Sequence, residues 1–75
     1  MKDKILEILK DIRPDVDYIN SSNYIEDNLL DSFDLAALLG DIEDTFNIKI
    51  AGEELNKENF TNIDTIVNLV KKYNG

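Results

Sequence analysis

The chain has 75 residues, of which 43% are hydrophobic, and its sixteen acids against eight bases give a net charge of −8. This length supports one small core, and the composition is that of a folded domain. Without Cys or His, the chain cannot form disulfides, Cys/His metal sites, thiol nucleophiles or histidine bases. The acidic charge argues against binding to nucleic acid or anionic membranes. With no long apolar run and no signal-peptide pattern, we expect one cytoplasmic domain over residues 1–75, without membrane insertion.

Three stretches have the apolar spacing of amphipathic helices. The first covers residues 2–13, with Asp3 as its cap and Pro14 as its stop. The second follows Asp31, and the third follows Asn62. Their apolar stripes comprise Ile5, Leu6, Ile8, Leu9 and Ile12; Leu35, Leu38, Leu39, Ile42 and Phe46; and Ile63, Ile66, Val67, Val70 and Tyr73.

The connecting segments are less regular. Residues 14–31 form a long loop, with a short turn near residues 23–26. Six apolar side chains are expected to anchor this loop: Tyr18, Ile19, Tyr24, Ile25, Leu29 and Leu30. We expect the hydroxyls of its two tyrosines to contact solvent. Residues 47–50 alternate like a strand, but no second strand exists to pair with them, so an extended connector is expected. Residues 53–60 predict a short helix beginning near Asn56, anchored by Leu55 and Phe60.

The predicted fold is therefore all-α: a small four-helix bundle of three longer helices and one short helix, with a long loop between the first two helices. Charge is unevenly distributed, because residues 14–56 hold eleven acids and one base. We expect an exposed acidic face centred on the second long helix. Such a face keeps a small protein soluble or docks a basic partner, and the residues alone leave both open.

Asp31-Ser32-Phe33 stands at the start of the second long helix. Asp-Ser before an apolar run is an ordinary helix cap, but Phe33 falls outside the core stripe. Ala36, Ala37 and Gly40 also lie off this stripe and form a smooth strip that another protein could approach. Helix N-terminal amides favour an attached phosphate on Ser32. No histidine and no nearby Lys or Arg could activate this serine for attack, so it is better suited to being modified.

These residues resemble the acyl carrier proteins and the related peptidyl carrier domains. The resemblance lies in Asp31-Ser32-Phe33-Asp34-Leu35, Leu38-Leu39, Ile42-Glu43-Asp44-Thr45-Phe46 and Ile48-Lys49-Ile50, and the order of elements extends it over the whole chain. Phe33 replaces the usual leucine, Ala37 a frequent acid, and Gly40 a bulky residue. The longer segment 53–60 looks more like discrete carriers that work beside adenylating ligases, including the D-alanyl type.

The resemblance implies a non-catalytic carrier in which Ser32 receives 4′-phosphopantetheine from coenzyme A through a phosphopantetheinyl transferase that requires Mg²⁺. Asp31 would cap the helix and help the transferase recognise it. The partner-binding face would comprise Phe33, Asp34, Ala36, Ala37, Gly40, Glu43 and Asp44. Expected partners are this transferase, an acyl- or aminoacyl-loading ligase or transferase, and downstream synthases with basic patches, in fatty-acid or secondary-metabolite biosynthesis. A monomer is expected.

Two other functions stay open at this point. An aminoacyl or peptidyl carrier would share Ser32 and its arm but hold a different cargo. An acidic interaction module that is never modified would share the helices and the charge. A calcium-binding module is disfavoured, because the loop pattern of an EF-hand is absent from the sequence.

Overall fold

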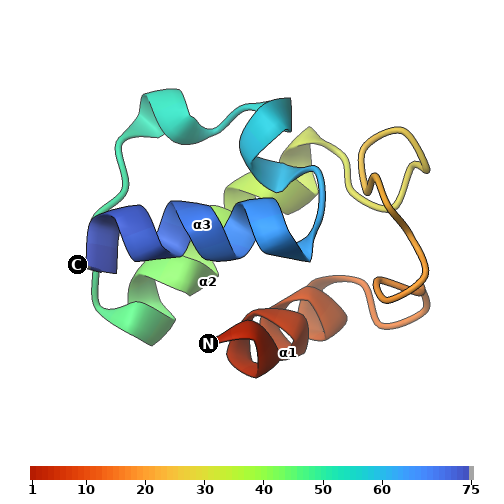
Figure 1. Ribbon diagram of the computed structural model, residues 1–75, viewed down its shortest axis with the longest axis horizontal. Coiled ribbons are helices and arrows are strands. Elements are labelled where there is room, and N and C mark those ends of the chain that lie inside the picture. The colour runs from red at the N-terminus through yellow and green to blue at the C-terminus, as the bar shows by residue number, and fades with distance from the viewer. Residues whose placement is uncertain (75) are drawn as a thin grey trace.

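The computed structural model describes residues 1–74. Within them every regular element is helical, and the chain follows the order shown in Figure 1. The elements are α1 (Lys2–Ile12), α2 (Ser32–Phe46), the short 3₁₀ helices η1 (Gly52–Glu54) and η2 (Lys57–Phe60), and α3 (Ile63–Asn74). The all-α prediction and its three long helices are confirmed, while the predicted fourth helix is a 3₁₀ turn preceded by a second one that was not expected.

Helix α1 ends where the sequence predicts and begins differently. Arg13, just before Pro14, has φ −137° and ψ 89° and so leaves the helical region. The N-cap is Met1, which makes no side-chain capping bond, and Asp3 lies inside the first turn. The prediction of Asp3 as the cap was therefore wrong. Asp3 still favours the helix there, because a carboxylate in the first turn complements the helix dipole.

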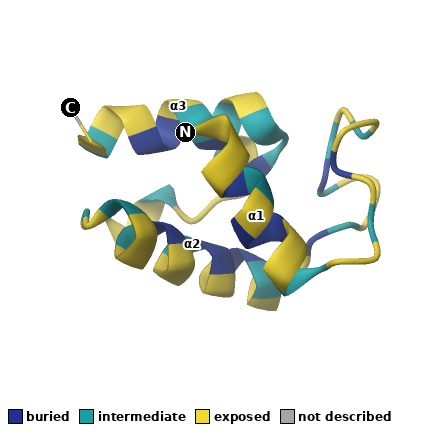
Figure 2. Ribbon diagram, turned by 90° about the horizontal axis from the view of Figure 1, so that it is seen from below, coloured by how far each residue is buried: buried dark blue, intermediate teal, exposed yellow. Residues whose placement is uncertain are grey.

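The three long helices bury their apolar stripes against one another. Figure 2 shows α1 crossing between α2 and α3, with the buried residues on the faces turned inward. Asn62 caps α3 as predicted, since its Oδ1 accepts a hydrogen bond of 3.0 Å from the backbone N–H of Thr65. Leu69 is also buried in this core, although the predicted stripe on α3 did not include it. Among residues 1–74, no helix is long and apolar enough to cross a membrane.

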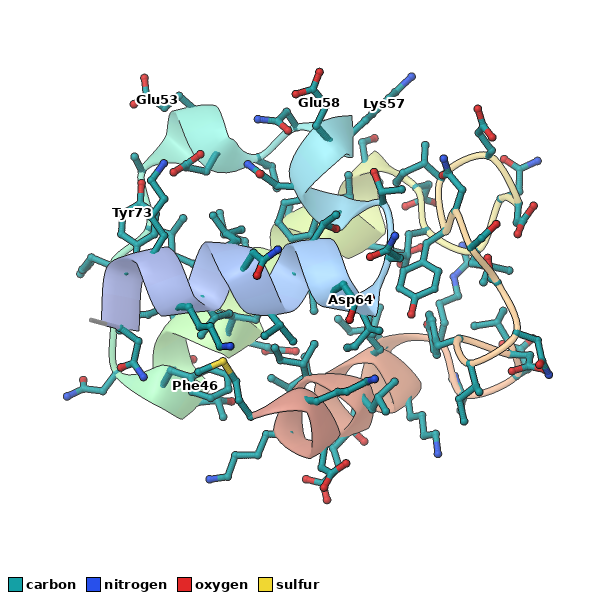
Figure 3. All side chains as sticks on the ribbon, viewed as in Figure 1. Phe46, Glu53, Lys57, Glu58, Asp64 and Tyr73 are labelled. Atoms are coloured by element: carbon teal, nitrogen blue, oxygen red, sulfur yellow. The ribbon has the colours of Figure 1, made fainter. Side chains whose placement is uncertain are left out.

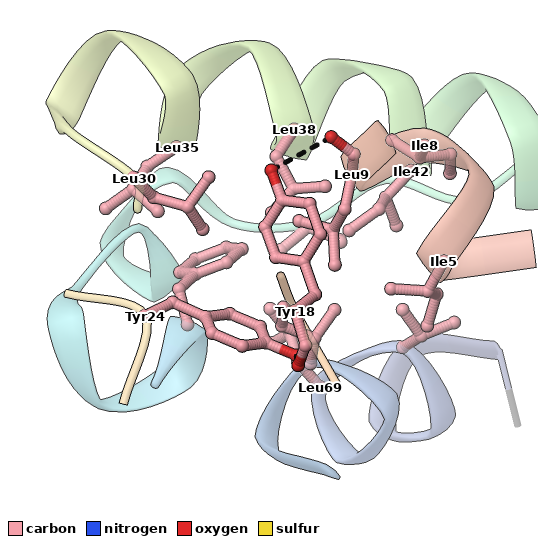
Figure 4. Close-up of a cluster of buried hydrophobic side chains, with 14 residues drawn as sticks. Ile5, Ile8, Leu9, Tyr18, Tyr24, Leu30, Leu35, Leu38, Ile42 and Leu69 are labelled. Atoms are coloured by element: carbon pink, nitrogen blue, oxygen red, sulfur yellow. Dashed lines mark hydrogen bonds between the residues drawn. The ribbon is translucent and has the colours of Figure 1, made fainter. Parts of the chain in front are cut away.

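Two tyrosines from the long loop fill the centre of the core. Tyr18 and Tyr24 are buried and pack edge to face, with ring centroids 5.3 Å apart. The Tyr18 hydroxyl donates to the carbonyl oxygen of Leu9 at 3.0 Å (Figure 4), and the Tyr24 hydroxyl donates to the carbonyl oxygen of Tyr18 at 2.8 Å. The expectation of solvated hydroxyls was wrong, because backbone carbonyls inside the core replace water. Burial raises the pKa of Tyr18 to about 12.

The other predicted loop anchors divide between core and surface. Leu30 is buried, and Ile25 and Leu29 are half-buried against the core. Ile19 is 76% exposed and anchors nothing, because the preceding Asp17 carboxylate holds it in a local turn by accepting from its backbone N–H at 3.1 Å. The turn predicted near residues 23–26 is present, organised by the Asn23 side chain, which accepts from the N–H groups of the two residues that follow Tyr24.

Residues 47–60 lead from α2 back to α3. Residues 47–50 form an extended connector, as predicted, and Asn47 begins it in the left-handed region at φ 55°. Asn56 caps η2 by accepting from the N–H of Asn59 at 3.1 Å, and Phe60 is fully buried. Leu55 is 38% exposed, so its predicted anchoring role was wrong.

The unexpected helix η1 is held against α3 by Glu54. Its Oε2 accepts hydrogen bonds of 2.7 Å from both Lys72 Nζ and the Tyr73 hydroxyl. Figure 3 shows Tyr73 on α3 beneath this segment. The anchor is thus polar, and a pattern of apolar residues indicates Leu55 but not Glu54.

Candidate functional site

Ser32 is the first residue of α2, as the sequence predicts, and it lies exposed at the N-terminus of that helix. Among residues 1–74, no hydrogen-bond partner engages its hydroxyl. The backbone N–H groups of the first helical turn lie beside it, where they favour a negative charge. Ser32 is therefore accessible, uncommitted and placed where an attached anion is stabilised.

Asp31 and Asp34 fix the backbone on both sides of Ser32. The Asp31 Oδ1 accepts from the N–H of Asp34 at 2.9 Å, and the Asp34 Oδ2 accepts from the N–H of Asp31 at 3.1 Å. This reciprocal pair is a capping box with Asp in place of the usual Glu. The predicted cap at Asp31 is confirmed. The hydrogen bond from the Asp34 N–H, reinforced by the nearby charge of Arg13, lowers the pKa of the Asp31 carboxyl.

Arg13 joins the end of α1 to this capping box. Its Nε donates to the Asp34 Oδ2 at 3.0 Å, and its Nη2 lies 3.5 Å from the Asp31 Oδ2. Sequence analysis did not single out Arg13, because its partners lie 18 and 21 residues away and no local pattern links them. The available signal was its place beside a helix-stopping proline. Arg13 thus reinforces the backbone geometry that presents Ser32.

A groove of about 300 Å³ opens beside Ser32. Leu35 shares this side of α2 with Ser32, because residues three apart on a helix are neighbours. The opposite wall comes from the long loop and from η2. The groove is lined by Ile25, Asn28, Leu30, Asp31, Ser32, Leu35 and Lys57. It offers an apolar floor with one ammonium-bearing side chain in its wall.

The predicted partner-binding residues divide into an exposed group and a group with partners inside the chain. Phe33 is 87% exposed, and the strip that follows it is exposed too, as predicted: Ala36, Ala37 and Gly40. Asp44 is exposed, and so is Asp41, which the prediction did not include. Asp34 serves the capping box, and Glu43 Oε2 accepts from the N–H of Ile50 at 2.8 Å. The open part of this surface is therefore apolar at the start of α2 and acidic along it.

Gly40 has a simple environment. A Cβ built on it would meet no heavy atom within 4 Å, apart from its chain neighbours and the backbone of α2. Among residues 1–74, nothing therefore requires a glycine at this position, although glycine weakens a helix interior.

The side chains around Ser32 determine what its hydroxyl can do. The chain has no His and no Cys, and the carboxylates closest in sequence to Ser32 are engaged in the capping box. In the part of the chain that the structure describes, no group of three or more carboxylates is arranged to hold a metal ion. Lys57 is the basic side chain that shares the groove with Ser32.

Comparison with known proteins places this chain in a family. No protein-family model matches the chain, and no solved structure matches it significantly. The chain is 41% identical over 54 residues to the acyl carrier protein of Buchnera aphidicola subsp. Baizongia pistaciae (strain Bp), an alignment that covers 72% of this chain and 67% of that protein. The chain belongs to the acyl carrier protein family. As a member of the acyl carrier protein family it is expected to serve biosynthetic enzymes, and the earlier resemblance is confirmed at the level of the family.

Proposed function

We propose that this chain is a non-catalytic acyl carrier whose Ser32 holds a 4′-phosphopantetheine arm, and that residues 1–75 act as one carrier domain. The observation that carries this proposal is the exposed, uncommitted hydroxyl of Ser32 at the capped start of α2. Membership of the acyl carrier protein family supports it.

The residues present fit such a group. The first-turn amides of α2 favour its phosphate, and the groove beside Ser32 leaves room for the chain that follows. When attached, the arm supplies a terminal thiol that holds acyl groups as thioesters. The protein itself contributes position: Asp31, Asp34 and Arg13 hold the backbone at residue 32 in one conformation.

The attachment step needs a second protein. The Ser32 Oγ forms a bond to the β-phosphorus of coenzyme A, the phosphoanhydride bond breaks, and adenosine 3′,5′-bisphosphate leaves. The hydroxyl proton passes to a base of a Mg²⁺-dependent phosphopantetheinyl transferase. Ser32 is thus the acceptor, and catalysis belongs to the partner.

The partner surface follows from exposure and charge. Phe33 provides an apolar anchor, and the smooth strip behind it allows close approach. Asp41 and Asp44 present exposed carboxylates along the same helix, which would attract basic patches on a transferase, a loading ligase or a synthase. Asp34 and Glu43 would add to this field while remaining tied to the chain's own backbone.

One observation favours a second candidate, an aminoacyl carrier that works with an adenylating ligase, for example of the D-alanyl type. The centre of the bundle is filled by Tyr18, Tyr24 and Phe60, all buried. A short polar cargo needs no space there, whereas a long fatty chain would have to displace these rings. Both candidates share Ser32 and its arm.

Intact mass after incubation with coenzyme A, Mg²⁺ and a permissive phosphopantetheinyl transferase tests the carrier. We expect a gain of one phosphopantetheinyl group that is lost in Ser32→Ala. It should be retained in Ser22→Ala, which alters another exposed serine. No gain in a folded wild-type chain would refute the proposal and leave an unmodified acidic interaction module. Loading the arm with amino acids or fatty acids by adenylating ligases then separates the two candidates.

A further inference from the structure

We propose that Lys57 binds the phosphodiester on Ser32 and holds the arm along the groove between α2 and η2. This inference rests on the proposed function, because it concerns the same serine. It adds a binding residue from a different element, 25 positions along the chain.

Charge provides the first argument. A phosphodiester on Ser32 adds a negative charge next to Asp31, whose carboxylate is already ionised, in a chain with a net charge of −8. Two cationic side chains approach this end of α2. Arg13 is engaged by Asp34 and Asp31. Lys57 makes no ion pair among residues 1–74, so its ammonium is available to a new anion.

The second argument is the side of the helix on which each cation lies. Successive residues are about 100° apart around a helix, so Ser32 and Asp34 point to nearly opposite sides of α2. Arg13 lies on the side of Asp34, whereas Lys57 and Ser32 line the same groove. Lys57 is also the one basic residue in that lining. The anion and the available cation therefore share one side of the helix.

A second hollow beside Lys57 is unfavourable for the phosphodiester, because carboxylates line it. Lys57 and Ile25 also line a second hollow of about 250 Å³, on whose walls lie Glu26 and Glu58. These carboxylates repel a phosphodiester, so they disfavour an arm that runs over the second hollow. Figure 3 shows the Lys57 side chain extending outward from η2. Because the Lys57 side chain lines the groove that Ser32 also lines, its flexible four-carbon stem would let the ammonium turn towards a phosphodiester on Ser32.

The motion of the arm tests the inference. Each chain is first loaded with ¹⁵N-labelled phosphopantetheine and checked by intact mass, and the order parameter of the arm amide nearest the phosphate is then measured by NMR at low salt. The variants are Lys57→Gln, Lys57→Arg and the control Lys49→Gln. The control removes the same charge from beyond the far end of α2, a 15-residue helix about 22 Å long.

We expect an order parameter above about 0.6 in the wild type, Lys57→Arg and Lys49→Gln, and a lower value in Lys57→Gln. Raising the ionic strength from about 0.01 M to about 1 M should lower the order parameter of the wild-type arm to the value in Lys57→Gln, because exposed charges are then screened. If the arm is mobile in the loaded wild type, or equally ordered in Lys57→Gln, Lys57 does not hold the arm. That result overturns the role of Lys57 and leaves the proposed carrier function standing. A chain that gains no mass refutes the proposed function and removes the inference with it.

Discussion

Gly40→Ala should make the protein more stable. Gly40 lies inside α2, where glycine is about 0.8–1.0 kcal/mol less favourable than alanine. The added Cβ meets no neighbouring heavy atom within 4 Å, so no clash offsets this gain. We therefore expect the free energy of unfolding to rise by about 1 kcal/mol, which raises the Tm of a domain of this size by about 4–8 °C.

Thermal and urea unfolding followed by circular dichroism measure this change. Gly52→Ala is the matched control, because its Cβ also enters open space, but at the start of η1 and outside an α-helix. Its Tm should shift less. A Tm for Gly40→Ala that is unchanged or lower would refute the reasoning. If the stabilised variant is loaded more slowly, a partner approaches the helix at this glycine.

Three further changes probe the cap, the core and the exposed aromatic. The pKa of Asp31 is lower in the folded chain than its unfolded value of about 3.9, so the ionised carboxylate stabilises the fold above that pH. This stability is lost as the pH falls below that value. In Asp31→Asn, the free energy of unfolding measured in urea should therefore depend less on acid pH. The raised pKa of Tyr18 contributes stability that is lost as the pH rises from about 10 to about 12. Tyr18→Phe should remove this loss of stability at high pH. At neutral pH it should lower the free energy of unfolding by about 1 kcal/mol. This cost is small because the Leu9 carbonyl oxygen still accepts a hydrogen bond from the Arg13 N–H. Phe33→Ala should change the unfolding free energy by less than about 0.5 kcal/mol yet slow arm transfer about tenfold, and an unchanged transfer rate would exclude Phe33 from docking.

Local patterns in the sequence were enough to predict the long helices and the start of the site. The 3.6-residue period identifies each helix, and Pro14 and Asp31 mark a stop and a start through steric and hydrogen-bonding effects within a few residues. Ser32 and Phe33 could be placed at the surface for the same reason, because the stripe on α2 already fills the face that packs. These predictions depend on neighbours in sequence, which the sequence displays directly.

Contacts between distant segments could not be predicted in this way. The Arg13 ion pairs and the polar anchor at Glu54 join residues 18 or more positions apart, and either member alone resembles an ordinary surface charge. Burial of the Tyr18 hydroxyl depends on a carbonyl that happens to face it at the end of α1. Ile19 shows the converse case, in which a local turn overrides hydrophobicity. The groove beside Ser32 likewise exists only once η2 is folded next to α2.

The contact between Arg13 and Asp31 has a consequence for the long loop, since it brings together the two residues that flank positions 14–30. Once both ends of a flexible segment are held, each doubling of its length costs only about 0.6 kcal/mol of closure entropy. Figure 2 shows part of this loop projecting from the helices, and Ser22 within it is exposed. A short reporter peptide inserted after Ser22 should therefore leave the helices folded, which makes this loop a place to attach a label without altering α2.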